Sequence, residues 1–232
     1  MNHPVTRPTV YAHRGARADE PENTLRSFRR AARDGADGVE LDVRVSSDGH
    51  LVVIHDAKVD RTTDGTGEIA ALTLAEIQAL DAGQGESVPT FDAAMAVCPD
   101  LVQVEIKALE AVQALADRDR EEPLGPGVVL TSFSLTAVEA AARLLPHIPR
   151  GVITHHPGPE MIANAQDLKA SWVCPELKPE LTAELVEECR QAGLKVDAWP
   201  AADPERYLRC VRIGADAVTT DFPAAIADWP AA

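Results

Sequence analysis

The amino-acid sequence predicts an α/β fold in which eight parallel strands close into a barrel, with a small hairpin and helix insertion after the second strand. Short apolar runs alternate with amphipathic segments along nearly the whole chain, a pattern typical of repeated strand–helix units. Eight such units fit within 232 residues, a usual length for a (β/α)8 barrel, or TIM barrel. The dipeptide Asp48-Gly49 between two apolar runs predicts a hairpin that interrupts the alternation.

The expected elements follow from the period of the apolar residues. The first helix carries Leu25 and Phe28 on its apolar face and ends at Gly35, a residue suited to a left-handed helix end. The insertion spans about 44–90 and the hairpin returns over 51–54. We expect barrel strands over 9–12, 39–43, 101–107, 128–132, 151–154, 171–174, 194–199 and 217–220, and helices near 74–80, 91–97, 109–120, 135–145, 159–169, 180–192, 204–213 and 223–228.

An open doubly wound sheet is the main alternative to the barrel. Such a sheet often carries a G-x-G-x-x-G turn after its first strand, whereas this chain reads His13-Arg14-Gly15-Ala16 there. The chain also contains no low-complexity segment and no linker. We therefore expect residues 1–232 to form one barrel domain.

The charge balance excludes some partners. The chain has 22 Lys and Arg against 37 Asp and Glu, a formal charge of −15. An acidic surface repels polyanions, so nucleic acid and anionic membranes are poor partners, and an anionic substrate needs a local cationic site. The apolar runs are too short to span a membrane, and residues 1–8 lack the apolar core of a signal peptide. The four cysteines lack C-x-x-C spacing, which favours free thiols in the cytoplasm.

Acidic residues recur two positions apart on two neighbouring strands. Glu40 and Asp42 share one face of the second strand, and Glu105 and Lys107 share one face of the third. Because the active site of such a barrel lies at the carboxyl ends of its strands, we expect the three carboxylates to converge there. The three carboxylates repel one another unless a cation lies among them, and Mg²⁺ and Ca²⁺ are the ions that prefer oxygen ligands. The alternative is a structural ion network with Arg14 and Lys107.

Two histidines are expected at the same mouth. His13 ends the first strand, and the hairpin returns His55 towards the second. Histidine titrates near neutral pH, so the two can act as general acid and base. The alternation of side chains along the seventh strand directs Trp199 into the barrel at the end of that strand, which makes it a candidate wall of the substrate site. His155 and His156 also follow a strand and could be metal ligands in another type of enzyme. An amidohydrolase-type barrel, however, needs H-x-H on its first strand, which this chain lacks, so we expect His155 and His156 to be rim or loop residues.

Six motifs resemble, in order, those of the glycerophosphodiester phosphodiesterase family within the PLC-like phosphodiesterase superfamily. The resemblance covers nearly the whole chain, and the order of its His-Arg-Gly, Glu-x-Asp and His-Asp blocks is highly specific. The motifs are AHRGARADEPENT at 12–24, GADGVELDV at 35–43, SSDGHLVVIHDAKVDRTTDGTG at 46–67, VEIK at 104–107, LTSF at 130–133 and TTDFP at 219–223.

The resemblance implies a hydrolase of lipid and glycerol metabolism that converts glycerophosphodiesters to glycerol 3-phosphate and an alcohol, by way of a cyclic phosphate. It also implies an acid–base pair, a set of metal ligands and two phosphate contacts. The acid–base pair is His13 and His55. The metal ligands are Glu40, Asp42 and Glu105, and the phosphate contacts are Arg14 and Lys107. One departure concerns the glycerol end of the substrate. Relatives commonly read Trp-Thr-Val-Asn where this chain reads Trp199-Pro200-Ala201-Ala202.

Two other functions remain open. A lysophospholipase D of the same superfamily would prefer a long acyl chain and should carry an apolar groove or an added interfacial loop, neither of which is obvious in this sequence. A non-catalytic sensor of a metal or a phosphodiester would lack catalytic groups, and none of the core set is missing. Comparing glycerophosphocholine with lysophosphatidylcholine as substrates separates the first of these from the family's usual activity.

Overall fold

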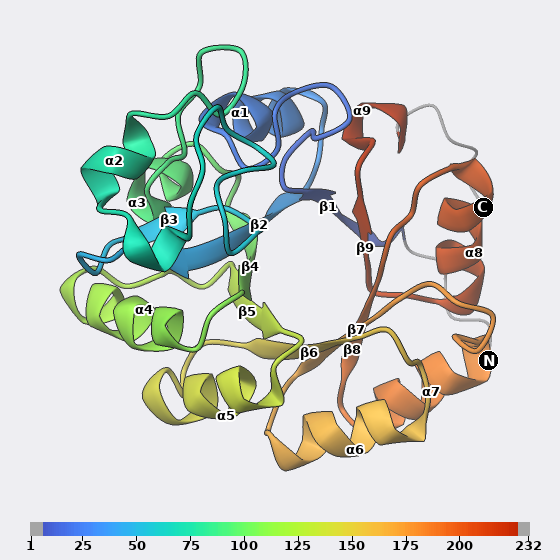
Figure 1. Ribbon diagram of the computed structural model, residues 1–232. Coiled ribbons are helices and arrows are strands. Elements are labelled where there is room, and N and C mark those ends of the chain that lie inside the picture. Colours follow the sequence, from blue (N-terminus) through green and yellow to red (C-terminus); the bar gives the residue numbers. More distant parts are fainter. Residues whose placement is uncertain (1–6, 227–232) are drawn as a thin grey trace.

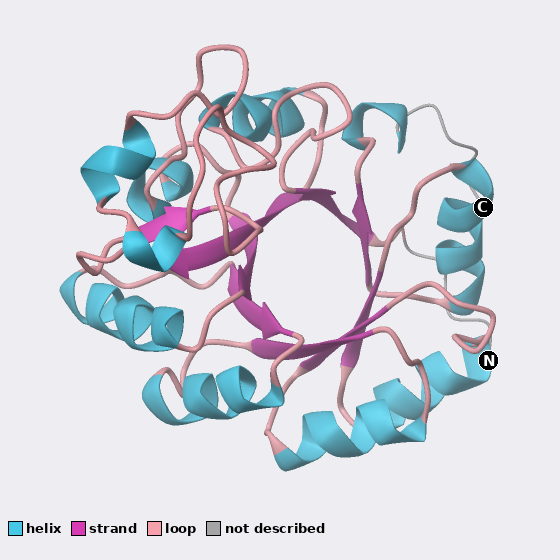
Figure 2. Cartoon of the chain, in the orientation of Figure 1, coloured by secondary structure: helices cyan, strands magenta, loops and turns pink. Residues whose placement is uncertain are grey.

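Eight parallel strands form a closed barrel with helices on its outside, as the computed structural model shows for residues 7–226 (Figures 1 and 2). The strand order is β1-β9-β8-β7-β6-β5-β4-β2, and pairing of β1 with β2 closes the ring. The predicted (β/α)8 barrel is therefore confirmed. No helix among the described residues has the length and apolar composition needed to cross a bilayer.

The barrel strands match the expected ones, with ends that differ by at most about two residues. They are β1 (Thr9–His13), β2 (Gly38–Val45), β4 (Leu101–Ile106), β5 (Val128–Ser132), β6 (Arg150–Thr154), β7 (Trp172–Pro175), β8 (Lys195–Ala198) and β9 (Ala217–Thr220). The outer helices are α1 (Leu25–Arg33), α4 (Glu110–Glu121), α5 (Leu135–Leu144), α6 (Pro159–Asp167), α7 (Ala183–Gln191), α8 (Pro204–Ile213) and α9 (Pro223–Ile226). Residues 227 and 228 of the last expected helix lie outside the described residues.

The insertion after β2 is also present, beside one edge of the barrel opening in Figure 1. Strand β3 (Leu51–Val53) pairs antiparallel with β2, and Gly49 in the turn has a φ of +88°, which the Asp48-Gly49 signal anticipates. The segment then contains η1 (Ile69–Ala71), α2 (Leu74–Gln78) and α3 (Phe91–Met95). The short 3-10 helix η1 was not expected, and α2 ends two residues before the predicted Leu80.

Side chains that alternate along the strands divide the barrel into an apolar outside and a polar inside. Val39, Leu41 and Val43 of β2 pack into an apolar cluster with α1, α4 and α5. A second cluster joins β6–β9 to α6–α8. Glu40 and Asp42 belong to the opposite face of β2, and they are buried as well. The strand alternation thus places carboxylates in the barrel interior, as the sequence predicts. All four cysteines are free.

The loop between β1 and α1 packs tightly against its own helix. Gly15 has a φ of +79°, and a Cβ there would lie 2.7 Å from the backbone carbonyl carbon of Ser27, so only glycine fits. The Ser27 hydroxyl donates a hydrogen bond to the carbonyl oxygen of Arg14 (2.8 Å). These contacts fix the backbone of Arg14 at the end of β1.

Asp197 of β8 is a fully buried carboxyl in the barrel interior, and burial raises its pKa to about 7. The Thr219 hydroxyl donates a hydrogen bond to it (2.9 Å), which only partly offsets the effect. Because the native pKa lies above that of the unfolded chain, stability falls as the pH rises from about 4 to about 7. The full loss corresponds to about 4 kcal/mol.

Replacement Asp197→Asn is therefore expected to raise the free energy of unfolding at pH 8 relative to wild type, and to change it much less at pH 4.5. Asparagine keeps an oxygen that accepts from Thr219 but carries no charge. Urea denaturation of both proteins at the two pH values measures the difference. An equal difference at both pH values would contradict the raised pKa.

Candidate functional site

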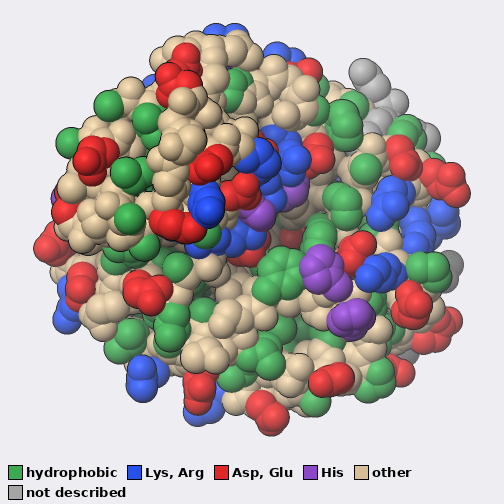
Figure 3. Space-filling model, in the orientation of Figure 1, with side chains coloured by type: hydrophobic (Ala, Val, Ile, Leu, Met, Phe, Trp, Pro, Cys, Tyr) green, Lys and Arg blue, Asp and Glu red, His purple; other side chains and the backbone are tan. Residues whose placement is uncertain are grey.

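A cavity of about 280 Å³ opens at the carboxyl ends of the barrel strands. Figure 3 shows cationic, acidic and histidine side chains gathered at the hollow in the middle of this face. Seven of the eight predicted site residues line the cavity: His13, Arg14, Glu40, His55, Glu105, Lys107 and Trp199. The eighth, Asp42, is fully buried and reaches the same cluster from the barrel interior. The predicted convergence is thus observed.

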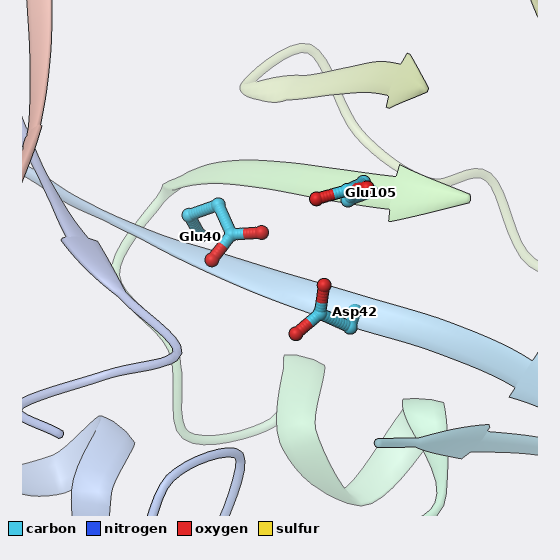
Figure 4. A group of neighbouring side chains, drawn as sticks. All are labelled: Glu40, Asp42 and Glu105. Atoms are coloured by element: carbon cyan, nitrogen blue, oxygen red, sulfur yellow. The ribbon is translucent and has the colours of Figure 1, made fainter. Parts of the chain in front are cut away.

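Three carboxylates meet between β2 and β4 (Figure 4). Glu40 and Asp42 lie on β2, and the strand register places Asp42 opposite Glu105 of β4. One oxygen of each carboxylate lies within 4.8 Å of the others. All three residues are buried. Such a group of anions in a protein interior is costly unless positive charge compensates it.

Two cations compensate this charge in part. Lys107 Nζ lies 2.6 Å from Glu105 Oε1 and 3.2 Å from Asp42 Oδ1. Arg14 Nε lies 3.2 Å from Asp42 Oδ2. Among the described residues, no lysine or arginine side chain lies within 4.0 Å of Glu40, whose Oε2 accepts from the backbone N–H of Arg14 (3.0 Å). An ion network with Arg14 and Lys107 therefore exists, but within the described part of the chain Glu40 has no lysine or arginine partner, and its nearest basic group is His13 Nε2 at 4.0 Å.

The pKa values reflect this shortage of positive charge. Burial, together with Asp42 and Glu105, raises the pKa of Glu40 well above its usual value. Burial and Asp42 raise the pKa of Glu105 to about 7. Burial alone would also raise the pKa of Asp42, but Lys107 and Arg14 hold it below its usual value.

The donor set fits a hard divalent cation. Asp42 Oδ1 is buried and accepts no hydrogen bond, although Lys107 Nζ lies 3.2 Å away. Asp42 Oδ2 accepts from the side-chain amide of Asn23 (2.8 Å), which orients the carboxylate. Carboxylate oxygens are the ligands that Mg²⁺ and Ca²⁺ prefer, and a divalent ion would supply the missing charge.

Both histidines are oriented by a carboxylate at Nδ1. His13 Nδ1 lies 2.6 Å from Asp221 Oδ1, and His55 Nδ1 lies 2.6 Å from Asp56 Oδ1. A carboxylate accepts the Nδ1 proton, so Nε2 is the nitrogen left to exchange a proton with a ligand. Burial lowers the pKa of His55, which favours its neutral form. Asp221 follows β9 and Asp56 belongs to the insertion after β2, so the carboxylates that hold the two histidines come from different segments.

Phe133, His155 and Trp199 form an aromatic wall of the cavity next to its charged groups, and Lys107 Nζ lies 5.8 Å from the centroid of the Phe133 ring. The Phe133 and His155 rings stack with centroids 4.8 Å apart, and the Trp199 ring meets them edge-on at 5.7 and 5.3 Å. The Trp199 indole N–H donates to the carbonyl oxygen of Cys174 (2.7 Å), which fixes the ring. His155 is an exposed rim residue as expected, yet it also lines the cavity; His156 does not.

Several residues of the site were given no role by the sequence. Glu22 and Asn23 lie inside the motif at 12–24, which is the signal that would have identified them. Phe133 directly follows β5 and ends the motif at 130–133. Arg61 binds both Asp56 and Glu22, and it lies inside the motif at 46–67, which would have identified it in the same way.

Comparisons with known proteins match one family along nearly the whole chain. The model of the Glycerophosphoryl diester phosphodiesterase family matches residues 13–125 and 107–225. A glycerophosphodiester phosphodiesterase of Caldanaerobacter subterraneus subsp. tengcongensis is 35% identical over 92% of this chain and 94% of its own. The structure of an Oleispira antarctica phosphodiesterase in complex with the product sn-glycerol-3-phosphate has a TM-score of 0.87 and 30% identity, over 95% of this chain and 96% of that one. A glycerophosphodiester phosphodiesterase from Agrobacterium tumefaciens has a TM-score of 0.82 and 28% identity, over 95% and 99%.

Proposed function

The chain belongs to the glycerophosphoryl diester phosphodiesterase family, and we propose that it hydrolyses glycerophosphodiesters to glycerol 3-phosphate and an alcohol by metal-assisted acid–base catalysis. The observation that carries the proposal is the meeting of three buried carboxylates and two oriented histidines at one cavity. The Oleispira relative, solved with sn-glycerol-3-phosphate, supports this choice of product. The free cysteines support a reducing compartment such as the cytoplasm.

We assign the metal site to Glu40, Asp42 and Glu105, with Mg²⁺ or Ca²⁺ as the ion. When bound, the ion would supply positive charge for the phosphate and would acidify the hydroxyl that attacks it. Arg14 and Lys107 would contact the phosphate oxygens. With these two cations and the ion, the site would carry about one net positive charge towards a singly charged diester. Surface charges beyond about 8 Å are largely screened at physiological salt, so the charge of −15 does not prevent binding.

The two histidines would move the protons. One of His13 and His55 removes the proton of the glycerol 2-hydroxyl, whose oxygen then attacks phosphorus. The other donates a proton to the departing alcohol. A cyclic phosphate results, and water opens it with the two roles reversed. Direct attack of a water molecule on the diester is the alternative route.

The aromatic wall would bind the carbon skeleton of the substrate. Trp199 and Phe133 offer apolar surface beside the charged groups, with Lys107 Nζ 5.8 Å from the centroid of the Phe133 ring, so a diester can place its phosphate at Arg14 and Lys107 and its alcohol along the rings. Three positions after Trp199, the chain carries Ala202 where the family motif that it resembles commonly has asparagine. We therefore propose that recognition of the glycerol end depends more on Trp199 here.

One observation favours a second candidate, hydrolysis of a lysophospholipid. Leu109, Phe133 and Leu135 follow β4 and β5 and are 48%, 40% and 41% exposed. Phe133 lines the cavity, and Leu109 and Leu135 lie in the segments that leave β4 and β5 at the same end of the barrel. An acyl chain that leaves the cavity on this side would cover them.

Assays with purified protein test both candidates. We expect hydrolysis of glycerophosphocholine, complete loss of activity with a chelator, and recovery on addition of excess Mg²⁺ or Ca²⁺. Lysophosphatidylcholine, assayed in parallel, tests the second candidate. Absence of turnover of every diester with both ions would contradict the proposed function, and turnover that resists the chelator would contradict the metal assignment.

A further inference from the structure

We propose that Glu22 is a positioning residue that connects the first barrel loop to the inserted hairpin and thereby orients His55. The inference deepens the proposed function, because it takes His55 as one of the two proton-transfer groups. It rests on a continuous chain of ion pairs that starts at Arg14 and ends at the His55 ring.

Glu22 accepts hydrogen bonds from two arginines at once, and Arg17 NH2 lies 4.0 Å from its Oε2. Its Oε1 accepts from Arg14 NH1 (2.9 Å) and Arg61 NH2 (2.8 Å), and its Oε2 accepts from Arg61 NH1 (3.0 Å). The Glu22 side chain is only 12% exposed. Hydrogen bonds from the two arginines lower its pKa to about 2 despite burial, so the carboxylate stays ionised. Arg14 belongs to the β1–α1 loop and Arg61 to the insertion, so this carboxylate bridges the two segments.

The other edge of Arg61 holds the carboxylate that orients His55. Arg61 Nε donates to Asp56 Oδ2 (2.7 Å) and Arg61 NH2 donates to Asp56 Oδ1 (3.0 Å). Asp56 Oδ1 in turn lies 2.6 Å from His55 Nδ1. A planar guanidinium that forms paired hydrogen bonds on both edges fixes its two partners relative to one another. The position of Glu22 is therefore transmitted to the imidazole ring.

The insertion does not need this chain of ion pairs to fold. It has an apolar cluster of its own that includes Val52, Val59 and Ile77, and β3 is paired with β2. Arg44 Nε also donates to the carbonyl oxygen of His55 (2.9 Å), which holds the backbone at this point. The side chain of His55 is left to be oriented by Asp56. Loss of Glu22 should thus change the ring and its chemistry while the fold persists.

The test compares Glu22→Gln, Arg61→Lys and the double variant with wild type in the glycerophosphocholine assay. We expect each single change to lower kcat about tenfold. Arg61→Lys should leave KM unchanged, whereas Glu22→Gln should raise KM a few fold because it also weakens one of the two carboxylate contacts that hold Arg14. The double variant should have a kcat no lower than that of the less active single variant, because both changes interrupt the same series of ion pairs. The ¹⁵N chemical shifts of the His55 ring should change in both single variants.

Glu68→Gln is the matched control, because Glu68 pairs with Lys58 within the same insertion (3.4 Å) and contacts none of the residues in the series of ion pairs from Arg14 to His55. It should leave kcat, KM and the His55 shifts as in wild type. The inference is overturned if Glu22→Gln behaves like this control, or if the effects of the two single changes on kcat multiply. If the wild-type protein cleaves no diester, the proposed function fails separately, and the His55 shifts still decide whether Glu22 orients the ring.

Discussion

Alanine at His13 or at His55 is expected to lower kcat by about 10²–10⁴-fold, the usual effect of losing a general acid or base. Each ring is held through Nδ1 by a carboxylate, Asp221 for His13 and Asp56 for His55, so that Nε2 remains for proton transfer. Alanine removes that nitrogen and places no other proton carrier there. Steady-state kinetics with glycerophosphocholine measure the loss, and KM should change much less than kcat.

His50→Ala is the control for this pair of variants. His50 lies beyond the turn of the inserted hairpin, is exposed, and lies near Asp48 rather than the cavity. It should have wild-type kinetics. The slow His13 and His55 variants should also accumulate a cyclic glycerophosphate, detectable by ³¹P NMR. Full activity of either alanine variant would contradict the acid–base assignment. Full-rate cleavage of a diester without a neighbouring hydroxyl would exclude the cyclic route.

Glu40→Gln is expected to abolish activity and at the same time to stabilise the metal-free protein. Glu40 lies next to two other carboxylates, lacks a lysine or arginine partner among the described residues, and has a pKa raised mainly by burial. Ionisation of such a group destabilises the native state as the pH rises, and glutamine removes that effect. The metal-free variant should therefore melt at a higher temperature than metal-free wild type at pH 8.

Addition of metal should reverse this order. An ion present at 100 times its Kd stabilises wild type by about 2.7 kcal/mol, whereas the variant lacks one of the three ligands and should gain little. Thermal melts with chelator and with Mg²⁺ or Ca²⁺ measure both effects without reference to turnover. Glu139→Gln, on the exposed surface of α5, is the control and should respond to metal as wild type does. Equal responses of wild type and Glu40→Gln would contradict the metal assignment.

The sequence predicts the barrel and the charged half of the site because both depend on strand periodicity. On β2, the alternation of Val39, Leu41 and Val43 with Glu40 and Asp42 fixes which side chains face inward. The hairpin signal at Asp48-Gly49 likewise predicts the return of the chain towards β2, which brings His55 to the cavity. These inferences need only the local period and the known location of active sites in barrels.

The remaining features depend on contacts between residues far apart in the chain. Glu22 and Arg61 are 39 positions apart, and neither lies in a periodic segment that would predict their meeting. The stacking of Phe133 on His155 depends on the path of two loops after β5 and β6. The raised pKa of Asp197 results from complete burial. The alternation along the strand indicates that this side chain faces inward, but it does not indicate how completely the side chain is buried. Loop conformation and burial of this kind follow from tertiary packing.

The apolar cluster of the insertion has a consequence for how the enzyme loses activity. Strand β3 and the residue after it contribute alternate side chains to two cores, Val52 and Ile54 to the insertion and Leu51 and Val53 to the barrel. The insertion core is much the smaller, so this region should open locally at a lower free energy than the whole barrel. Such an opening carries His55 away from His13 while the eight-stranded ring stays intact. We therefore expect a local unfolding equilibrium of the insertion to set the upper temperature limit of catalysis, and changes that enlarge its core to extend that limit without touching the active site.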